Sequence, residues 1–460
     1  MRLWYSNEPK LVEVFKKLKP FIKFLILVSL VISLTGCAGG ETRDSKTLTV
    51  WHWMSDREQA LNDLAKKFET DTGFKVKFEL YAPSEIYSQR IKASAQTNTL
   101  PDIYGVLGEK RDFASYINSG YVADLSSDLA QSTGSLSETA PAWQDTFFQK
   151  ALAVNEFLPD NEYGVKPGIY GIPIDVTTIQ MVYNKKLYAK AGLDPEAPPA
   201  TWSDFVAHSR RLKEKNIPRF VSGFGEIWMI EALASNYAMN LMGEEKVFET
   251  YQGKVPYTDP DWIRILSLFK EIRDQKILVE GAVTMVNKTA EQTFANERAA
   301  VAFNGSWCVN VYKGMNPGLE YGVFLPPKLE VSRPMKIWGG AGSSFVVNAR
   351  SPRRDAAIRF LKWLTAEEQQ AALSDQTENL PSNKNSLKKI APVLSEFADD
   401  MDNAVHPNTY PVHEIPAVAE AFDKGIQSIL IGEKTPEEVA EEVQRIKQKE
   451  MAKKSAHGLP

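Results

Sequence analysis

The sequence contains few of the residues that build metal and redox centres. Its 460 residues include two cysteines, Cys37 and Cys308, and five histidines. None of them forms a His-x-x-x-His or Cys-x-x-Cys pair, the spacings that bring two ligands to one metal ion. We therefore expect no metal site and no cofactor, and a disulfide-stapled mini-protein is excluded.

An excess of positive charge is also missing. The chain has 54 Lys and Arg against 58 Asp and Glu, which gives a net charge of −4. Because nucleic-acid binding needs a basic surface for the phosphate backbone, nucleic acid is not an expected partner. A composition of 43% hydrophobic and 24% charged residues is that of a globular chain, and the length suggests two or three compact units.

Signatures of catalysis are absent too. No Gly-x-Ser-x-Gly occurs, and the stretches that begin at Gly223 and Gly340 each start a dinucleotide fingerprint but lack its last glycine. Carboxylates are numerous enough for a glycosidase pair, yet none sits in a recognisable motif. We expect no catalytic residue; the enzyme alternative is a surface-anchored glycoside hydrolase or polysaccharide lyase.

The N-terminal segment has the pattern of an export signal. Six Lys or Arg lie in the first 23 residues, and the uncharged run Phe24–Leu34 that follows is shorter than the roughly 20 apolar residues that span a bilayer. It ends Leu34-Thr-Gly-Cys37, which resembles a bacterial lipobox. This resemblance implies that residues 1–36 are a lipoprotein signal peptide and that Cys37 is diacylated, holding the protein on the outer face of the cell membrane. The alternative is a plain signal peptide with an incidental cysteine.

Removal of the signal peptide changes the charge balance. It takes away six basic and two acidic residues, which leaves 48 Lys and Arg, 56 Asp and Glu and a net charge of −8. Residues 37–46 are small and polar and predict a tether between the membrane and the folded body. Cys308 then has no partner in the chain, and its apolar surroundings favour a buried packing role over a nucleophilic one.

Strand and helix patterns alternate along the mature chain. Leu48–Trp51 and Lys75–Leu80 alternate as strands, and between them an amphipathic helix with an apolar face ends at Gly73. Further strands are predicted at Ile103–Leu107, Ile172–Ile174 and Ile179–Tyr183. The class is therefore α/β.

Helix starts are marked by capping residues. Side chains that cap helices in proteins are Ser, Thr, Asp and Asn, with Glu three residues on and Pro at the first helical position as supporting signs. The predicted starts are Ser55 with Glu58, Thr201 before Trp202–Lys215, Ser351 with Pro352, Thr365 with Glu368, and Thr435 with Pro436 and Glu438.

This alternation continues for more than 400 residues, which exceeds what one doubly wound sheet usually holds. We therefore expect two α/β lobes with a cleft between them. In such folds, ligands sit in loops beyond the carboxyl ends of the strands.

From about Thr47 onward the chain resembles the extracellular solute-binding proteins of bacterial ABC importers (family 1), the group that includes maltose-binding protein. Singly the shared stretches are weak, but together they occur in the family's order and spacing. They are Leu48-Thr-Val-Trp-His-Trp, Phe68-Glu-Thr-Asp-Thr-Gly-Phe-Lys-Val76, Leu100-Pro-Asp-Ile103, Tyr170-Gly-Ile-Pro-Ile-Asp-Val, Met181-Val-Tyr-Asn184-Lys, Pro199-Ala-Thr-Trp-Ser-Asp-Phe205, Phe294-Ala-Asn-Glu-Arg-Ala-Ala-Val, Asn304-Gly-Ser-Trp307, Trp338-Gly-Gly340, Ala357–Leu364 and Asn379-Leu-Pro-Ser382.

The resemblance implies a periplasmic-binding-protein-like fold of type II, with two α/β lobes joined by crossing hinge segments. It places the N-terminal lobe at 45–155 plus 326–376 and the C-terminal lobe at 156–325 plus 377–460. It also implies a monomer that grips a ligand between the lobes and delivers it to the transmembrane subunits of an ABC permease. Presentation of the ligand to a sensor kinase would use the same closed state.

The chemistry of a sugar ligand selects candidate residues at the loops that the family uses. A pyranose has apolar C–H faces that flat aromatic rings cover, and hydroxyls that planar polar side chains satisfy. For each ring the alternative is core packing, and for each charged side chain it is a solvated position at the rim. The candidate ligand-binding residues are Trp53, Asp56, Glu109, Lys110, Glu226, Trp228, Trp307, Trp338 and Gly339.

Other residues receive a structural role or depart from the pattern. Asp102 follows Pro101 and is expected to cap loop amides. Near Tyr410 and His413 the family often has a last aromatic contact, but Tyr-Pro-Val-His replaces its pattern here. Trp51, Trp202, Trp262 and Trp363 are assigned to the core.

The charge of the candidates favours a neutral ligand. A cationic ligand would need an acidic aromatic box, and a phosphate would need Arg or a helix N-terminus. One Lys, several carboxylates and no Arg indicate a neutral sugar or oligosaccharide, while a uronate could pair with Lys110. The alternative within the same fold is a peptide, a polyamine or a phosphorylated compound.

Overall fold

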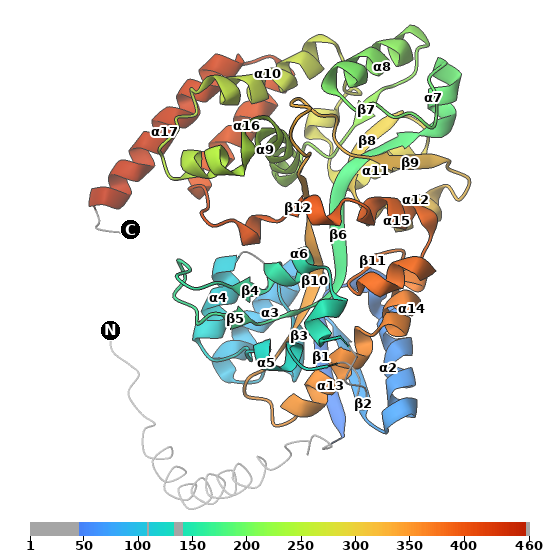
Figure 1. Ribbon diagram of the computed structural model, residues 1–460, viewed down its shortest axis with the longest axis vertical. Helices are drawn as coiled ribbons and strands as arrows, with labels where there is room; N and C mark the ends of the chain where they lie inside the picture. Colours follow the sequence, from blue (N-terminus) through green and yellow to red (C-terminus); the bar gives the residue numbers. More distant parts are fainter. Residues whose placement is uncertain (1–45, 108–109, 133–140, 457–460) are drawn as a thin grey trace, which may run out of the picture. The chain divides into compact units, whose positions relative to one another are not determined.

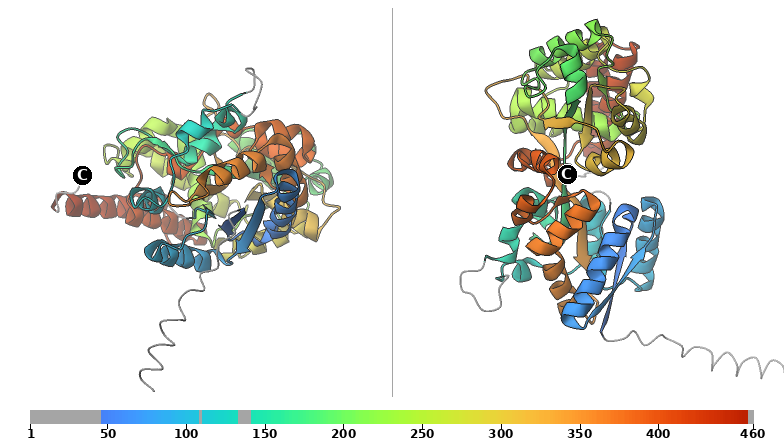
Figure 2. Two further views of the ribbon diagram at one scale, coloured as in Figure 1. Left: turned by 90° about the horizontal axis from the view of Figure 1, so that it is seen from below. Right: turned by 90° about the vertical axis from the view of Figure 1, so that its right-hand side faces the viewer.

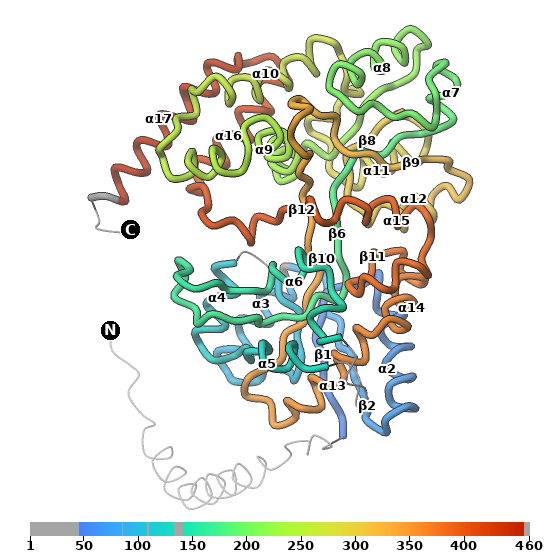
Figure 3. Tube along the Cα trace, in the orientation of Figure 1, coloured from blue at the N-terminus to red at the C-terminus, as the bar shows by residue number. Residues whose placement is uncertain are grey.

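The computed structural model describes residues 46–107, 110–132 and 141–456. The chain divides into residues 1–47 and a compact unit of residues 48–460. The predicted signal peptide, Cys37 and Glu109 lie outside the described residues. The tube in Figure 3 follows the course of the chain.

One ten-stranded sheet organises the described chain, in the order β2-β1-β3-β10-β6-β8-β7, with β9 and β11 also paired to β6 and β12 paired to β10. A small second sheet joins β4 to β5. The strands are β1 (Thr47–His52), β2 (Lys75–Leu80), β3 (Ile103–Gly105), β4 (Glu156–Phe157), β5 (Gly168–Ile169), β6 (Ile172–Asn184), β7 (Phe220–Val221), β8 (Val301–Gly305), β9 (Tyr321–Phe324), β10 (Ile337–Val347), β11 (Leu380–Pro381) and β12 (Ala404–Val405).

Helices surround both ends of this sheet (Figure 1). They are α2 (Glu58–Thr72), α3 (Ser84–Thr97), α4 (Lys110–Asn118), α5 (Ser126–Leu129), α6 (Gln149–Val154), α7 (Lys185–Ala191), α8 (Trp202–Glu214), α9 (Ile227–Tyr251), α10 (Pro260–Asp274), α11 (Asn287–Ala295), α12 (Cys308–Met315), α13 (Arg354–Leu364), α14 (Glu367–Thr377), α15 (Pro392–Ala398), α16 (Pro416–Ile431) and α17 (Pro436–Ala456), with short 3-10 turns η1 to η6 between them.

Two long strands connect the two ends of the sheet. Antiparallel pairing of β10 with β3 involves Phe345–Val347, and its pairing with the first half of β6 runs from Gly339 to Phe345. The second half of β6, from Ile179 onward, pairs instead with β8 and β9. The right-hand view in Figure 2 shows β6 as the narrow element between the two sets of helices. Both strands therefore pass from one set of elements to the other.

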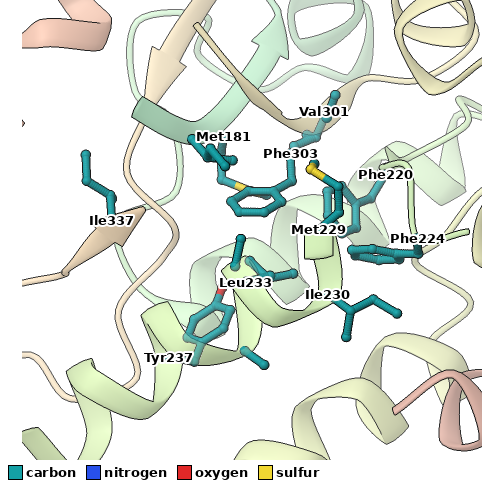
Figure 4. Packing of buried hydrophobic residues seen from close by; sticks show 14 of the residues in the cluster. Met181, Phe220, Phe224, Met229, Ile230, Leu233, Tyr237, Val301, Phe303 and Ile337 are labelled. Atoms are coloured by element: carbon teal, nitrogen blue, oxygen red, sulfur yellow. The ribbon is translucent and has the colours of Figure 1, made fainter. Parts of the chain in front are cut away.

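The buried side chains fall into separate clusters on either side of this crossing. At the end that holds β1 to β3, α2 and α13 pack on the sheet through Leu61, Phe68 and Phe360. At the other end, the first part of α9 is buried nearly all round and packs against β8 through Met229, Leu233 and Phe303 (Figure 4). Two cores that meet at β6 and β10 make two α/β lobes.

The change from one cluster to the other falls inside two strands. Ile172 and Ile174 belong to the cluster of the first lobe, whereas Ile179 belongs to that of the second. On the return, Ala341 lies in the second cluster and Phe345 in the first. The clusters thus change inside β6 and β10; the lobe boundaries given above stay a prediction.

Several predicted elements are confirmed. The strands β1 and β2 and the helix between them occur as expected, and Gly73 ends that helix with φ 71°. The Thr201 hydroxyl accepts a hydrogen bond from the Asp204 amide, and the Asp204 carboxylate accepts one from the Thr201 amide, which makes a capping box at α8. Thr435 and Glu438 form the same reciprocal pair at α17.

Other element boundaries were wrong. Residues 55–57 form a 3-10 turn, and α2 begins at Glu58 without a side-chain cap. The two strands predicted at 172–174 and 179–183 are one continuous strand, β6. The helices predicted to start at Ser351 and Thr365 begin at Arg354 and Glu367. The Ser351 hydroxyl donates to Asp102 and accepts from the Arg353 amide, and the Thr365 hydroxyl donates to the Leu361 carbonyl.

The residues assigned to structural roles are buried. Trp51, Trp202 and Trp262 are at most 6% exposed, and Trp363 is half-buried against Phe360. Cys308 is a free, buried thiol whose pKa is raised by burial. Trp143, which the sequence analysis did not single out, is also buried.

Asp102 accepts from a backbone amide, which lies in strand β1 and not in a loop as predicted, and it has a second role that was not predicted. Its Oδ2 accepts from the Thr49 amide at 2.9 Å. The Arg353 guanidinium also approaches both carboxylate oxygens, the nearest contact being 3.0 Å.

Candidate ligand-binding site

Three tryptophans from separate parts of the chain come together in the second lobe. Trp228 lies in the first turn of α9, Trp307 directly before α12, and Trp338 in β10. The ring centroids of Trp228 and Trp307 are 6.0 Å apart, and those of Trp228 and Trp338 are 6.4 Å apart with planes only 11° from parallel. All three rings are partly buried. We call this group the tryptophan cluster.

A carboxylate holds the indole of Trp228. Its Nε1 donates to Glu226 Oε2 at 2.9 Å, and Glu226 Oε1 accepts from the Asn287 backbone amide at 2.8 Å. Glu226 was predicted to contact the ligand. In the structure its two oxygens accept hydrogen bonds from the Trp228 indole and from the start of α11, and its contact with a ligand stays a prediction.

A second carboxylate holds Trp307 in the same way. Trp307 Nε1 donates to Glu291 Oε1 at 2.9 Å, and the amides of Asn287 and Asn304 donate to the same oxygen. Glu291 is 5% exposed, and burial raises its pKa while these hydrogen bonds oppose the shift. Gly305 lets the ring lie close to the strand, because a Cβ at that position would come within 1.9 Å of the ring.

Trp338 borders a cavity of about 450 Å³. Its wall in the second lobe comes largely from α9 and α16, and Lys110, Glu162 and Tyr163 line it from the other lobe. The residues that line the cavity include Lys110, Glu231, Tyr251, Trp338, Tyr410, His413, Glu414 and Asp423.

Lys110 is in the cavity wall, but its ammonium group already has partners. Lys110 Nζ donates to the carbonyls of Val154 at 2.7 Å and Glu156 at 2.5 Å, and it lies 4.2 Å from the centroid of the Phe157 ring. Burial lowers the pKa of Lys110 to about 8. These contacts tie Lys110 to its own lobe.

Trp53 and Asp56 lie elsewhere. The Trp53 ring covers Gly105, and its centroid is 5.2 Å from that of Tyr87. Asp56 has a half-exposed carboxylate 3.5 Å from the Arg57 guanidinium. Neither residue lines the cavity beside Trp338.

Gly339 is a site of close packing. A Cβ there would lie 2.8 Å from the Thr177 carbonyl and 3.1 Å from the Ala404 side chain, so only glycine fits between β6 and β12. Its role as a ligand contact stays a prediction, as do the roles of the other candidates.

Tyr410 and His413, where the family pattern is lost, both line the cavity. His413 Nδ1 is 2.9 Å from Glu162 Oε1, a contact between residues 251 positions apart. Burial raises the pKa of the Tyr410 phenol, and the neighbouring Trp338 opposes this shift. Side chains after β12 therefore contribute to the cavity even though the expected motif is missing.

Two features are absent from residues 46–107, 110–132 and 141–456. No helix among them is both long and apolar enough to cross a membrane. No three of their His, Cys, Asp and Glu side chains are gathered so that they could hold a metal ion.

Comparison with known proteins identifies the family. The family described as "Bacterial extracellular solute-binding protein" matches residues 63–403. The chain belongs to this family. It is 21% identical over 429 residues to the galactooligosaccharide-binding protein of Bacillus subtilis (strain 168), covering 91% of this chain and 94% of that protein. It is 26% identical over 381 residues to the diacetylchitobiose binding protein of Streptomyces coelicolor, covering 79% of this chain and 81% of that protein.

Solved structures show the same fold. A chitin oligosaccharide binding protein superimposes with a TM-score of 0.67 at 22% identity, covering 88% of this chain and 98% of that chain. A cyclo/maltodextrin-binding protein complexed with maltotetraose gives a TM-score of 0.66 at 16% identity, covering 88% of this chain and 97% of that chain. The predicted periplasmic-binding-protein-like α/β fold is thereby confirmed.

Proposed function

We propose that this protein is the extracytoplasmic binding component of an ABC importer and that it captures a sugar or oligosaccharide between its two lobes. The observation that carries the proposal is the tryptophan cluster, with one member, Trp338, on the wall of a 450 Å³ cavity. Flat rings cover the C–H faces of a pyranose, and the acidic and phenolic side chains of the cavity supply partners for its hydroxyls. The names of the relatives, which are sugar-binding proteins, support the same ligand class.

The rings of the cluster are fixed before a ligand arrives. Glu226 and Glu291 hold the N–H groups of Trp228 and Trp307, so neither indole must be ordered on binding. A side chain that is already in its bound orientation saves the conformational entropy that binding would otherwise cost.

Capture is proposed to be reversible and to involve no covalent chemistry. The crossing strands β6 and β10 act as the hinge, closure removes water from the ligand, and the closed form docks on the permease. The relatives compared above are named as binding proteins, which supports a protein that is not an enzyme. Incubation with oligosaccharides should leave them uncleaved.

Membrane attachment through Cys37 is part of the proposal. Two acyl chains on this residue would give stable anchoring at the extracytoplasmic face of the membrane. Mass spectrometry of the mature N-terminus tests it: an unmodified N-terminus upstream of Cys37, or one beyond it, would refute the anchor.

A thermal-shift screen against mono- and oligosaccharides tests the ligand class. A ligand at 100 times its dissociation constant stabilises the folded state by about 2.7 kcal/mol, which raises the melting temperature measurably. Stabilisation by saccharides supports the proposal. Stabilisation only by peptides or phosphorylated compounds would contradict it.

A further inference from the structure

Asp423 is a buried carboxylate that faces the cavity without a matching cation. It lies in the middle of α16, is 3% exposed, and lines the same cavity as Trp338. Its Oδ1 has no hydrogen-bond partner among the described residues, and no described Lys, Arg or His pairs with it. A buried carboxylate is normally paired, because its transfer from water is costly.

A second carboxylate and two phenols lie near Asp423. Glu231 of α9 lies on the same cavity wall and is the charged group that acts on Asp423 most strongly. The phenols of Tyr251, from α9, and Tyr257, from the segment before α10, are close enough for the charge of Asp423 to act on them.

The nearby cations are either already bound or exposed. Lys447 of α17 pairs with Glu414 at 2.6 Å, and Lys110 donates to backbone carbonyls. Arg111 and Lys454, which also line the cavity, are exposed side chains. The wall between α9 and α16 therefore keeps its acidic character.

Aromatic rings border this acidic wall. Tyr251, Tyr257, Trp262, Phe422 and Trp338 all line the cavity. Carboxylates combined with aromatic faces favour an ammonium group, which is attracted both by the charge and by the π-systems.

We propose that Asp423, with Glu231 beside it, binds the protonated amino group of the ligand, so that the cargo is a saccharide with a free amine rather than a neutral sugar. The inference deepens the proposed function and rests on it for the saccharide part alone. It replaces the expectation of a neutral ligand, which counted Lys110 as a free cation.

The cavity without a ligand and the cavity with a bound amine differ by one proton, which Asp423 carries only when no amine is bound. Burial, and then Glu231, raise the pKa of Asp423 to about 9, so the carboxyl is protonated near neutral pH while the cavity holds no cation. A bound ammonium group favours the carboxylate, and the Asp423 proton then leaves to the solvent. Binding of an amine at pH 7 should release about one proton, whereas binding of a neutral sugar should release none.

The test uses sugars that differ at one substituent. Isothermal titration calorimetry compares glucose, glucosamine and N-acetylglucosamine, the corresponding galactose series, and their disaccharides. We expect the amino form to bind at least about tenfold more tightly than its hydroxyl and N-acetyl counterparts. Titration in buffers of different ionisation enthalpy then measures the released proton.

Two variants separate charge from shape. Asp423→Asn keeps the size and removes the charge, so it should reduce the affinity for the amino sugar to the level of the neutral sugar and abolish proton release. Glu433→Gln removes an exposed carboxylate just after the same helix and should leave both affinities unchanged. Melting temperatures show that each variant is folded.

The outcomes distinguish this inference from the proposed function. Equal or tighter binding of the neutral sugars, or an equal loss of both ligands in Asp423→Asn, would overturn the inference and leave the proposed function standing. If no saccharide binds, spermidine tests the cation site alone. If the wild type binds spermidine and Asp423→Asn does not, the cation site is supported and the saccharide ligand is refuted. If spermidine does not bind either, both the cation site and the saccharide ligand are refuted.

Discussion

The indole N–H of Trp307, a member of the tryptophan cluster, donates a hydrogen bond to the buried carboxylate of Glu291, with 2.9 Å between Nε1 and Oε1. The two residues are 16 positions apart and come from different elements, α11 and the loop before α12. A hydrogen bond to a buried carboxylate fixes the ring orientation strongly, because charge-assisted bonds are about twice as strong as neutral ones. The ring is therefore held as a rigid surface.

Replacement of Trp307 by Ala should weaken sugar binding by on the order of 1–3 kcal/mol, since the ring's stacking area is lost. Calorimetry with the saccharide found in the thermal-shift screen measures the effect. Met315→Ala is the matched control, because Met315 is 41% exposed on the same helix, α12, and its removal should not change affinity. Unchanged binding in Trp307→Ala would remove this residue from the site.

The buried pair Asp102–Arg353 should carry much of the stability of the first lobe. Asp102→Asn leaves the Arg353 charge buried without its partner, which costs about 3–5 kcal/mol of unfolding free energy. Denaturant unfolding of the ligand-free protein measures it. Asp355→Asn, whose side chain is fully exposed 3.8 Å from Arg354, should change stability by less than about 0.5 kcal/mol. A similar cost in both variants would contradict the assignment.

Elements whose signals are local could be predicted from the sequence. The capping boxes at Thr201 and Thr435 involve residues three positions apart, and Gly73 ends its helix through its own backbone. The helices predicted to start at Ser351 and Thr365 start at Arg354 and Glu367 instead, and both hydroxyls have partners far away in the sequence: Asp102 accepts from Ser351, and the Trp143 indole donates to Thr365. No local pattern contains such long-range partners.

The candidate site, too, could be predicted from the sequence only in part. The loops that carry Trp228, Trp307 and Trp338 were found from the family pattern, which fixes where a loop lies. The pattern does not say which protein groups a charged side chain binds, so the partners of Glu226 and Lys110 within the protein were not predicted. Asp423 was missed, because a carboxylate on an amphipathic helix looks solvent-exposed until its neighbours are known.

Asp423 also predicts a pH dependence of stability. Its pKa is raised from the ordinary 3.8 to about 9, so folding favours the protonated carboxyl. The stability that this provides is fully present below pH 4 and is lost as the pH rises towards 9. In ligand-free protein, the unfolding free energy of the wild type should therefore fall relative to Asp423→Asn by on the order of 1 kcal/mol per pH unit between pH 6 and 8.

The comparison between variant and wild type is needed because another group titrates in the opposite sense. The pKa of Lys110 is lowered to about 8, and its contribution to stability grows as the pH rises through that value. Lys110 is present in both proteins, so its effect cancels in the difference. A difference that does not change between pH 6 and 8 would show that Asp423 is ionised in the folded protein.

Two glycines provide a final test of packing at the lobe crossing. Gly339→Ala places a Cβ 2.8 Å from the Thr177 carbonyl, 3.0 Å from the Thr178 methyl and 3.1 Å from Ala404, which should cost about 1–3 kcal/mol because β6 and β12 cannot both move away. Gly314→Ala is the matched control: no atom lies within 4 Å of the new Cβ, and Ala in α12 should stabilise the protein by about 0.5–1 kcal/mol. Opposite signs in the two variants, measured by thermal unfolding, would confirm that Gly339 is required by close strand packing. A Gly339→Ala protein of unchanged stability that no longer binds sugar would instead assign Gly339 to the ligand.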